Sequence, residues 1–201
     1  MPEPGDVEAA LDARLSGPRA AHCRGVAAAA RDLAVRFDVD PRQAVLAGLL
    51  HDWYRETPAV DLLALARRCG VVAPGTPDAE VLAGTLHGPV AARLLPERWS
   101  DLEPAVLWAI DRHTTGDVDM ADLDCVLFVG DMIEPGRSFP GVERLRAAAT
   151  RDLRAATLAV MDATLGDLLA RGRRIAPRAL AARNSLLARL EEGGAAGRPV
   201  R

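Results

Sequence analysis

A short apolar run, residues 45–50, ends directly on two polar residues, His51 and Asp52. The leucines of this run recur at helical spacing, which predicts a helix with one face buried in the core. A core helix rarely ends on two polar side chains unless both find a partner. A metal ion would satisfy both, because imidazole nitrogen and carboxylate oxygen are common metal ligands. The alternative is a helix end at which both side chains simply reach solvent.

The composition favours an all-α protein with one domain. Alanine and leucine dominate the 201 residues, aromatic residues make up only 3%, and long segments lack the alternation of strands. We expect a single domain over residues 1–192 and a flexible C-terminal tail over residues 193–201. The expected helices span residues 7–15, 17–37, 41–50, 58–69, 78–86, 90–95, 101–113, 119–131, 142–170 and 177–190, with Ser16, Asp40, Asp101 and Asp119 as N-caps.

Charge and hydropathy narrow the range of partners. The net charge is −3 and no segment forms a basic arm, which disfavours nucleic-acid binding. All 25 basic residues are arginines, so Schiff-base chemistry and a P-loop lysine are excluded. No apolar run approaches the ~20 residues needed to cross a bilayer, and the first thirty residues contain no secretory apolar core. These features predict a cytoplasmic protein that binds no membrane.

The three cysteines, Cys23, Cys69 and Cys125, are far apart and form no Cys-x-x-Cys pair. A disulfide framework or a zinc ribbon is therefore disfavoured, and buried thiols are the simpler interpretation. Cys23 follows His22, but adjacent residues on a helix point about 100° apart, so Cys23 is not expected to share a ligand site with it.

Every histidine in the chain lies at or near the end of an apolar helical segment, and two aspartates occupy similar places. These six side chains are His22, His51, Asp52, His87, His113 and Asp131. A single histidine at such a position is more often an ordinary core or surface residue. Six together supply enough ligands for two ions, with one carboxylate as a bridge, and bundles build metal sites from separate helices in this way.

Four sequence blocks resemble a known family. They are Ala-Gly-Leu-Leu-His-Asp at 47–52, Leu-His-Gly-Pro-Val at 86–90, Ala-Ile-Asp-Arg-His-Thr-Thr-Gly at 109–116 and Asp-Met-Ile-Glu-Pro-Gly-Arg at 131–137. Together with His22 they are similar to the bacterial YqeK-type family of HD-domain metal-dependent phosphohydrolases, over residues 15–190. The resemblance implies an HD-domain helical bundle with a dinuclear metal site in its core. It also implies symmetrical hydrolysis of diadenosine tetraphosphate to two ADP, and it leaves a homodimer open.

The resemblance also implies a role for each ligand. His22, His51, Asp52 and Asp131 hold one divalent ion, and His87 and His113 hold a second, with Asp52 as the bridge. Family members typically contain iron, and the mixed nitrogen and oxygen ligands also suit manganese or cobalt. Two such ions neutralise the polyphosphate and lower the pKa of water from 15.7 to about 7, which predicts a bridging hydroxide as the nucleophile. His51 and Asp52 are therefore the expected catalytic residues.

The expected substrate contacts are less specific. Arg137 follows a Pro-Gly turn shortly after Asp131 and is the main candidate for phosphate, with Arg55 as a weaker one. Thr114 and Gly116 could offer a hydroxyl and a backbone amide. The alternatives are an ordinary solvated arginine and a simple helix C-cap. Two positions depart from the family: Met132 replaces a usual lysine and Gly130 a usual alanine.

Two other functions stay open at this point. The first is an HD-domain phosphohydrolase that acts on a different nucleotide. The second is a regulatory module that binds a nucleotide without turnover, although such a module would have no need of the bridging Asp52.

Overall fold

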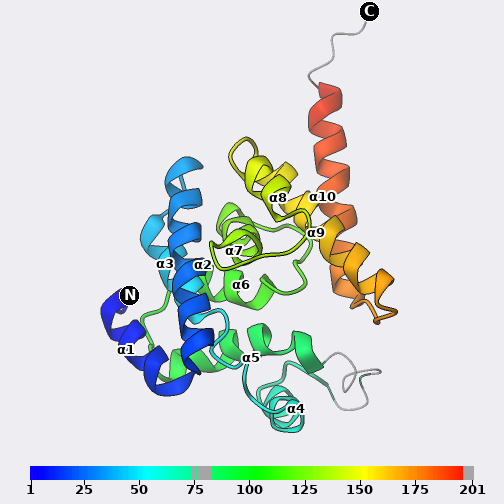
Figure 1. Cartoon of the computed structure of the whole chain (residues 1–201). Helices are drawn as coiled ribbons and strands as arrows, with labels where there is room; N and C mark the ends of the chain where they lie inside the picture. Colours follow the sequence, from blue (N-terminus) through cyan, green and yellow to red (C-terminus); the bar gives the residue numbers. More distant parts are fainter. Residues whose placement is uncertain (74–75, 77–82, 197–201) are drawn as a thin grey trace, which may run out of the picture.

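The chain folds into a layered bundle of α-helices (Figure 1). The computed structural model describes residues 1–73, 76 and 83–196, with the side chains of 193–196 excepted. Its helices are α1 Pro4–Arg14, α2 Gly17–Arg36, α3 Pro41–Leu50, α4 Ala59–Arg68, α5 His87–Leu94, α6 Pro104–Arg112, α7 Asp122–Ile133, α8 Val142–Ala149, α9 Leu153–Ala170 and α10 Pro177–Ala196. Short 3₁₀ turns at Ala83–Thr85 and Leu95–Glu97 flank α5. The described residues contain no strand, which confirms the predicted all-α class.

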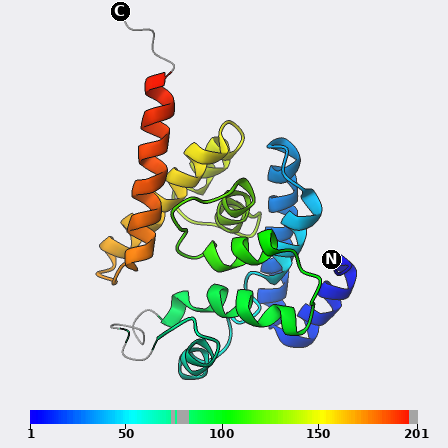
Figure 2. The same cartoon turned by 180° about the vertical axis from the view of Figure 1, so that it is seen from behind.

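Helix α7 lies at the centre of the bundle (Figure 1). Its residues 123–130 are all buried, because the helix packs against α2 and α3 on one side and α6, α8 and α9 on the others. Figure 2 shows α5 and α6 side by side, and the two helices are in direct contact. Helix α10 packs on α9 at the edge of the bundle. The histidines and aspartates of interest lie on α2, α5 and α7 and at the ends of α3 and α6.

The predicted starts of α2 and α3 are confirmed. The Ser16 hydroxyl accepts a hydrogen bond from the Arg19 amide at 3.4 Å. The Asp40 carboxylate accepts from the amide of Arg42 at 2.7 Å, and Pro41 occupies the first turn. Proline fits there because the first amides of a helix have no intrahelical acceptor.

Two predicted N-caps are wrong. The Asp101 carboxylate pairs with the N-terminal ammonium at 2.9 Å instead, and α6 begins three residues later, with Pro104 in its first turn. Asp119 has a left-handed backbone (φ 59°) and its carboxylate pairs with Arg189. Helix α7 begins only at Asp122, where Asp124 accepts a hydrogen bond from the Ala121 amide at 2.9 Å. In both cases a salt bridge with a distant residue competes with capping.

The single helix predicted over residues 142–170 is also wrong, because the chain breaks between α8 and α9. Asp152 is extended there (φ −152°, ψ 118°), and its carboxylate caps α9 by accepting from the Ala155 amide at 3.0 Å. Aspartate in this position competes with the helix for backbone donors.

The boundaries of α5 and α10 also differ from the prediction. Helix α5 begins at His87 rather than Val90, since a proline in the first turn costs no intrahelical bond. Helix α10 continues past Leu190 to Ala196 and takes in the first part of the expected tail. The helix predicted over residues 78–86 lies mostly outside the described residues. Among the helices of the described chain, none is long and apolar enough to span a membrane.

Candidate metal centre

The six predicted ligands converge on one buried point between α2, α5, α6 and α7. They are His22 of α2, His51 and Asp52 just after α3, His87 at the start of α5, His113 just after α6 and Asp131 near the end of α7. His51, Asp52, His87 and His113 are buried, and the other two are partly buried. The helical bundle thus brings together every predicted ligand.

Asp52 lies between two groups of imidazoles. Its Oδ1 is 3.1 Å from His87 Nε2 and 3.8 Å from His113 Nε2. Its Oδ2 is 3.5 Å from His51 Nε2 and 3.8 Å from His22 Nε2. One carboxylate therefore presents one oxygen to each pair of histidines, which is the geometry that a bridging ligand needs.

Asp131 completes the second of these groups. Its Oδ1 lies 3.0 Å from His22 Nε2. His22, His51 and Asp131 have one ligand atom each within 4.8 Å of the others, and so do His51, Asp52 and His113. The described residues therefore offer two overlapping clusters of metal-ligand type rather than one.

Backbone carbonyls hold three of the histidines in one orientation. In each, Nδ1 lies close to the carbonyl oxygen three residues earlier: Gly48 for His51 at 2.7 Å, Gly84 for His87 at 3.0 Å and Ile110 for His113 at 2.7 Å. A carbonyl oxygen only accepts, so each Nδ1 carries the proton and each Nε2 directs a lone pair at the centre. Metal-binding histidines are oriented in this way.

The imidazole nitrogens at the centre have too few donors among the described residues, because the Thr114 hydroxyl, 3.1 Å from His113 Nε2 and 3.4 Å from His87 Nε2, has one proton for two acceptors. His87 Nε2 and His113 Nε2 are only 2.9 Å apart, and with both Nδ1 atoms protonated two lone pairs face each other there. The Nε2 atoms of His22 and His51 are buried and have no hydrogen-bond partner among the described residues. Facing lone pairs and unpaired buried nitrogens are costly unless a cation lies between them. The donor set therefore fits divalent metal ions.

The pKa shifts of Asp52, Asp131 and His113 agree with this interpretation. Burial opposes ionisation of Asp52, but the neighbouring His51 outweighs it and holds the pKa of that carboxyl well below its usual range. The Asp131 carboxyl is also buried, yet the nearby His22 and His51 imidazoles lower its pKa. Burial lowers the pKa of His113 to about 3, whereas Asp52 overcomes burial at His51 and raises its pKa. Burial also raises the pKa of the Cys23 thiol to about 12, which disfavours the thiolate form that binds metal.

Two residues that support the ligands were missed in the sequence. Arg19 donates from Nη1 to Asp52 Oδ2 at 2.8 Å. Glu134 Oε1 lies 3.2 Å from His22 Nδ1, and its other oxygen accepts from the Gly136 amide at 2.6 Å. Two sequence signals could have indicated them. Arg19 lies three residues before His22, on the same face of α2, and Glu134 lies within the 131–137 block.

Arg137 lies at this centre but contacts a ligand. Its Nε donates to the Asp131 carbonyl oxygen at 2.8 Å, and its terminal nitrogen donates to the Asp131 carboxylate. The side chain also lines a cavity of about 240 Å³ that opens above the ligands. Arg137 thus lines this cavity, while its hydrogen bonds hold Asp131.

The other expected substrate contacts separate into two groups. Thr114 and Arg55 line the same cavity, and the Thr114 hydroxyl is 3.1 Å from His113 Nε2. Gly116 does not line it. Its amide donates to the Arg112 carbonyl oxygen at 2.7 Å, and its φ of 67° ends the helical turn, so the C-cap alternative describes it better than a substrate contact.

Comparison with known proteins identifies a family and several relatives of this chain. Residues 19–167 match the HD domain family. Over 176 residues the chain is 34% identical to a protein of Halalkalibacterium halodurans named "Bis(5'-nucleosyl)-tetraphosphatase, symmetrical", which covers 86% of this chain and 91% of that protein. A Bacillus subtilis protein of the same name is 31% identical over 169 residues, covering 84% of this chain and 89% of the relative.

A solved structure is also similar over almost its whole length. It is the crystal structure of an HD superfamily hydrolase from Clostridium acetobutylicum, described as involved in NAD metabolism. Its TM-score is 0.88 at 31% sequence identity, and the match covers 94% of this chain and 99% of that chain.

Proposed function

The chain belongs to the HD-domain family, within the group of symmetrical bis(5'-nucleosyl)-tetraphosphatases, and from this premise we propose that it hydrolyses diadenosine tetraphosphate to two ADP. The observation that carries the proposal is the position of Asp52 between two pairs of imidazoles. A substrate with four linked phosphates carries several negative charges, which must be neutralised before a nucleophile can attack. Two cations bound around Asp52 would supply that positive charge.

Two groups of residues would hold two divalent ions. His22, His51 and Asp131 would hold one, His87 and His113 the other, and Asp52 both. When bound, such ions supply Lewis acidity toward phosphoryl oxygens and hydroxide at neutral pH for attack on phosphorus. We propose iron as the native metal, and the nitrogen and oxygen donors are compatible with manganese or cobalt as well.

The side chains around the ligands orient the centre and the substrate. Arg19 keeps Asp52 in position, since the bond from its Nη1 occupies the oxygen that faces His51. Arg55, Thr114 and Arg137 line the opening, where the negative phosphate chain would lie within reach of their side chains. Guanidinium groups suit this task because they bind phosphate oxygens in a bidentate manner.

Product analysis tests the proposal. Digestion of diadenosine tetraphosphate in oxygen-18 water should give two ADP, with a single label in one of them. The Asp52→Asn variant, prepared in parallel, should give no products above background. ATP and AMP as first products would contradict the proposal. Turnover of a mononucleotide without cleavage of any dinucleotide would instead support the alternative of a different HD phosphohydrolase.

A further inference from the structure

A larger cavity of about 620 Å³ adjoins the opening above the metal ligands. The two share the residues Arg55, Gly84, Thr114, Phe128 and Thr164. The larger one extends away from the ligands to the connection between α9 and α10. A substrate with two identical halves needs room on that side for one nucleoside and its phosphates, and cavities of this size commonly hold small-molecule ligands.

The walls of this cavity differ in character. Phe128, Met161, Leu165 and Leu168 form an apolar wall. Arginines from the α9–α10 connection form a rim, and the cavity's aspartate, Asp167, is paired with Arg171 at 2.9 Å. An apolar wall beside a cationic rim matches a nucleotide, whose base is flat and apolar and whose phosphates are anionic.

Arg173 is held at this rim by the backbone. Helix α9 is followed by Gly172 in the left-handed conformation (φ 60°). The Gly172 amide donates to the Leu169 carbonyl at 3.0 Å, and the Arg173 amide donates to the Leu168 carbonyl at 2.8 Å. This pair of bonds is a Schellman motif, which ends the helix in one defined geometry. The motif therefore fixes the backbone position from which the Arg173 side chain extends.

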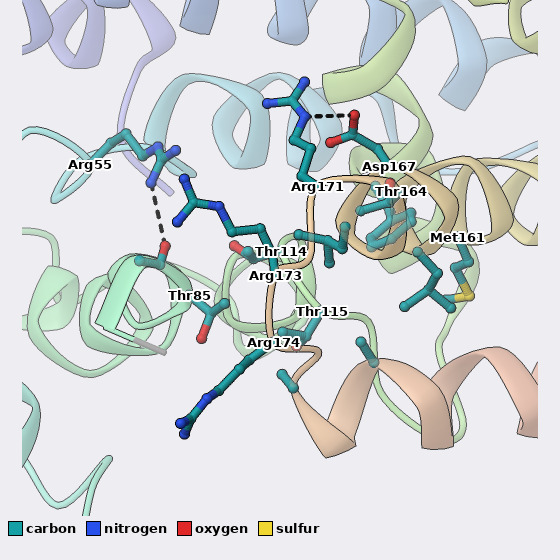
Figure 3. Close-up of a pocket in the computed structure, with 16 residues that line it drawn as sticks. Arg55, Thr85, Thr114, Thr115, Met161, Thr164, Asp167, Arg171, Arg173 and Arg174 are labelled. Carbon is teal, nitrogen blue, oxygen red and sulfur yellow. Dashed lines mark hydrogen bonds and ion pairs between the residues drawn. The ribbon is translucent and has the colours of Figure 1, made fainter. Parts of the chain in front are cut away.

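The Arg173 side chain points across the cavity toward Arg55 and Thr114 (Figure 3). Arg171 on the same turn is bonded to Asp167, but Arg173 has no side-chain hydrogen bond or ion pair within the part of the chain that the structure describes. Arg55 donates to the Gly84 carbonyl at 3.3 Å and to no other group among the described residues. Two guanidinium groups that face each other repel unless an anion lies between them, and a phosphate would accept from both.

We propose that Arg173 is a specificity-determining residue that binds, together with Arg55, a phosphate of the substrate half in this cavity. The apolar wall takes the nucleoside of that half. The ligand class is thus a nucleoside diphosphate group, either as part of a dinucleoside polyphosphate or as free ADP. The assignment of the half-substrate rests on the proposed function, whereas binding of ADP at Arg173 does not require turnover.

Calorimetric titration of the purified, metal-containing protein with ADP and with adenosine tests this site. Arg173→Ala should weaken ADP binding about 10-fold or more, because a charged hydrogen bond is lost. Adenosine binding should not change, because it has no phosphate. In turnover assays KM for diadenosine tetraphosphate should rise by a similar factor, with kcat within about twofold. Arg173→Lys should recover only part of the loss.

Arg144→Ala is the matched control, since Arg144 is an exposed arginine on α8 that does not line either cavity. It should leave every value unchanged. Equal ADP affinity in Arg173→Ala and the wild type would overturn the proposal, as would an equal loss of adenosine binding. Arg173→Gln provides the same test if the alanine variant is unstable. If ADP binding depends on Arg173 but the protein does not cleave the dinucleotide, the proposed function is refuted and the proposed binding site is supported.

Discussion

Arg137 binds Asp131 at two points: its Nε donates to the Asp131 backbone carbonyl and its terminal nitrogen to the carboxylate. The two residues are six positions apart, on either side of the end of α7. One arginine thus fixes both the backbone and the side chain of a predicted metal ligand. Arg137 therefore positions Asp131, besides lining the opening to which a phosphate would bind.

Replacement of Arg137 by alanine should weaken metal binding as well as catalysis. Loss of a residue that orients a metal ligand typically reduces metal affinity by about 10- to 100-fold. At limiting metal, Arg137→Ala should therefore contain less metal than the wild type, and added metal should restore the content. Elemental analysis after dialysis against defined metal concentrations measures this.

Kinetics at saturating metal then isolate the phosphate role of Arg137. If it also contacts substrate, kcat/KM should remain about 10- to 100-fold below wild type when the metal sites are full. Arg137→Lys should recover part of the metal affinity and little of the kcat/KM. Wild-type metal affinity in Arg137→Ala would show that its bonds to Asp131 are dispensable.

The two groups of imidazoles should bind metal separately. His22→Ala removes a nitrogen from the side of Asp52 Oδ2, and His87→Ala removes one from the side of Oδ1. Each variant should retain about half of the wild-type metal, whereas Asp52→Ala should lose most of both ions because it removes the shared ligand. Elemental analysis of the three proteins decides this. If His22→Ala and His87→Ala each lost all metal, the sites would be one cooperative unit.

The six proposed ligands could be singled out in the sequence because each lies at or near the end of an apolar helical segment. Helix ends are visible in a sequence, and Asp40-Pro41 identifies the helix that leads to His51. Hydrophobic periodicity predicts that these segments pack together, and the resemblance to the YqeK-type family implies that these ends meet at one metal site. The sequence does not show how Asp52 is oriented between the two imidazole pairs, since this depends on the packing of α2, α5, α6 and α7 together.

Long-range polar contacts were the part that sequence reasoning could not predict. Asp101 and Asp119 have the residue type of an N-cap, but the N-terminal ammonium and Arg189 bind their carboxylates instead. The same limit applies to Arg173, whose role depends on a cavity formed with residues more than fifty positions away, such as Arg55 and Thr114. No local pattern carries that information.

Glu134 should affect the metal centre through His22. Its carboxylate faces His22 Nδ1, which keeps the proton there and leaves Nε2 for the metal. Glu134→Gln preserves the shape but can present an amide donor in place of the carboxylate, so metal affinity should fall about 10-fold or more. Glu191→Gln, at an exposed carboxylate of α10, is the control. Metal titration measures the affinity of both variants. Equal metal affinities in the two would refute the role of Glu134.

Two glycines next to ligand positions should respond differently to alanine. Gly48 lies where α3 packs against α2, and a Cβ there would be 2.5 Å from the Ala27 Cα and 2.7 Å from the Ala27 amide nitrogen. Both are backbone atoms, so the helices would have to separate. Gly130, which precedes Asp131, has its nearest neighbour at 3.4 Å, an ordinary contact distance.

Gly48→Ala should therefore destabilise the protein by about 1–3 kcal/mol, as overpacking does in a tight core, and lower Tm by roughly 2–12 °C. It should also weaken metal binding, because the Gly48 carbonyl accepts from His51 Nδ1 and moves with the helix. Gly130→Ala should leave Tm unchanged or raise it, since alanine favours a helix by about 0.5–1 kcal/mol over glycine. Thermal unfolding with and without a chelator measures both effects. Equal Tm values in the two variants would mean that α2 and α3 do not depend on close contact at Gly48.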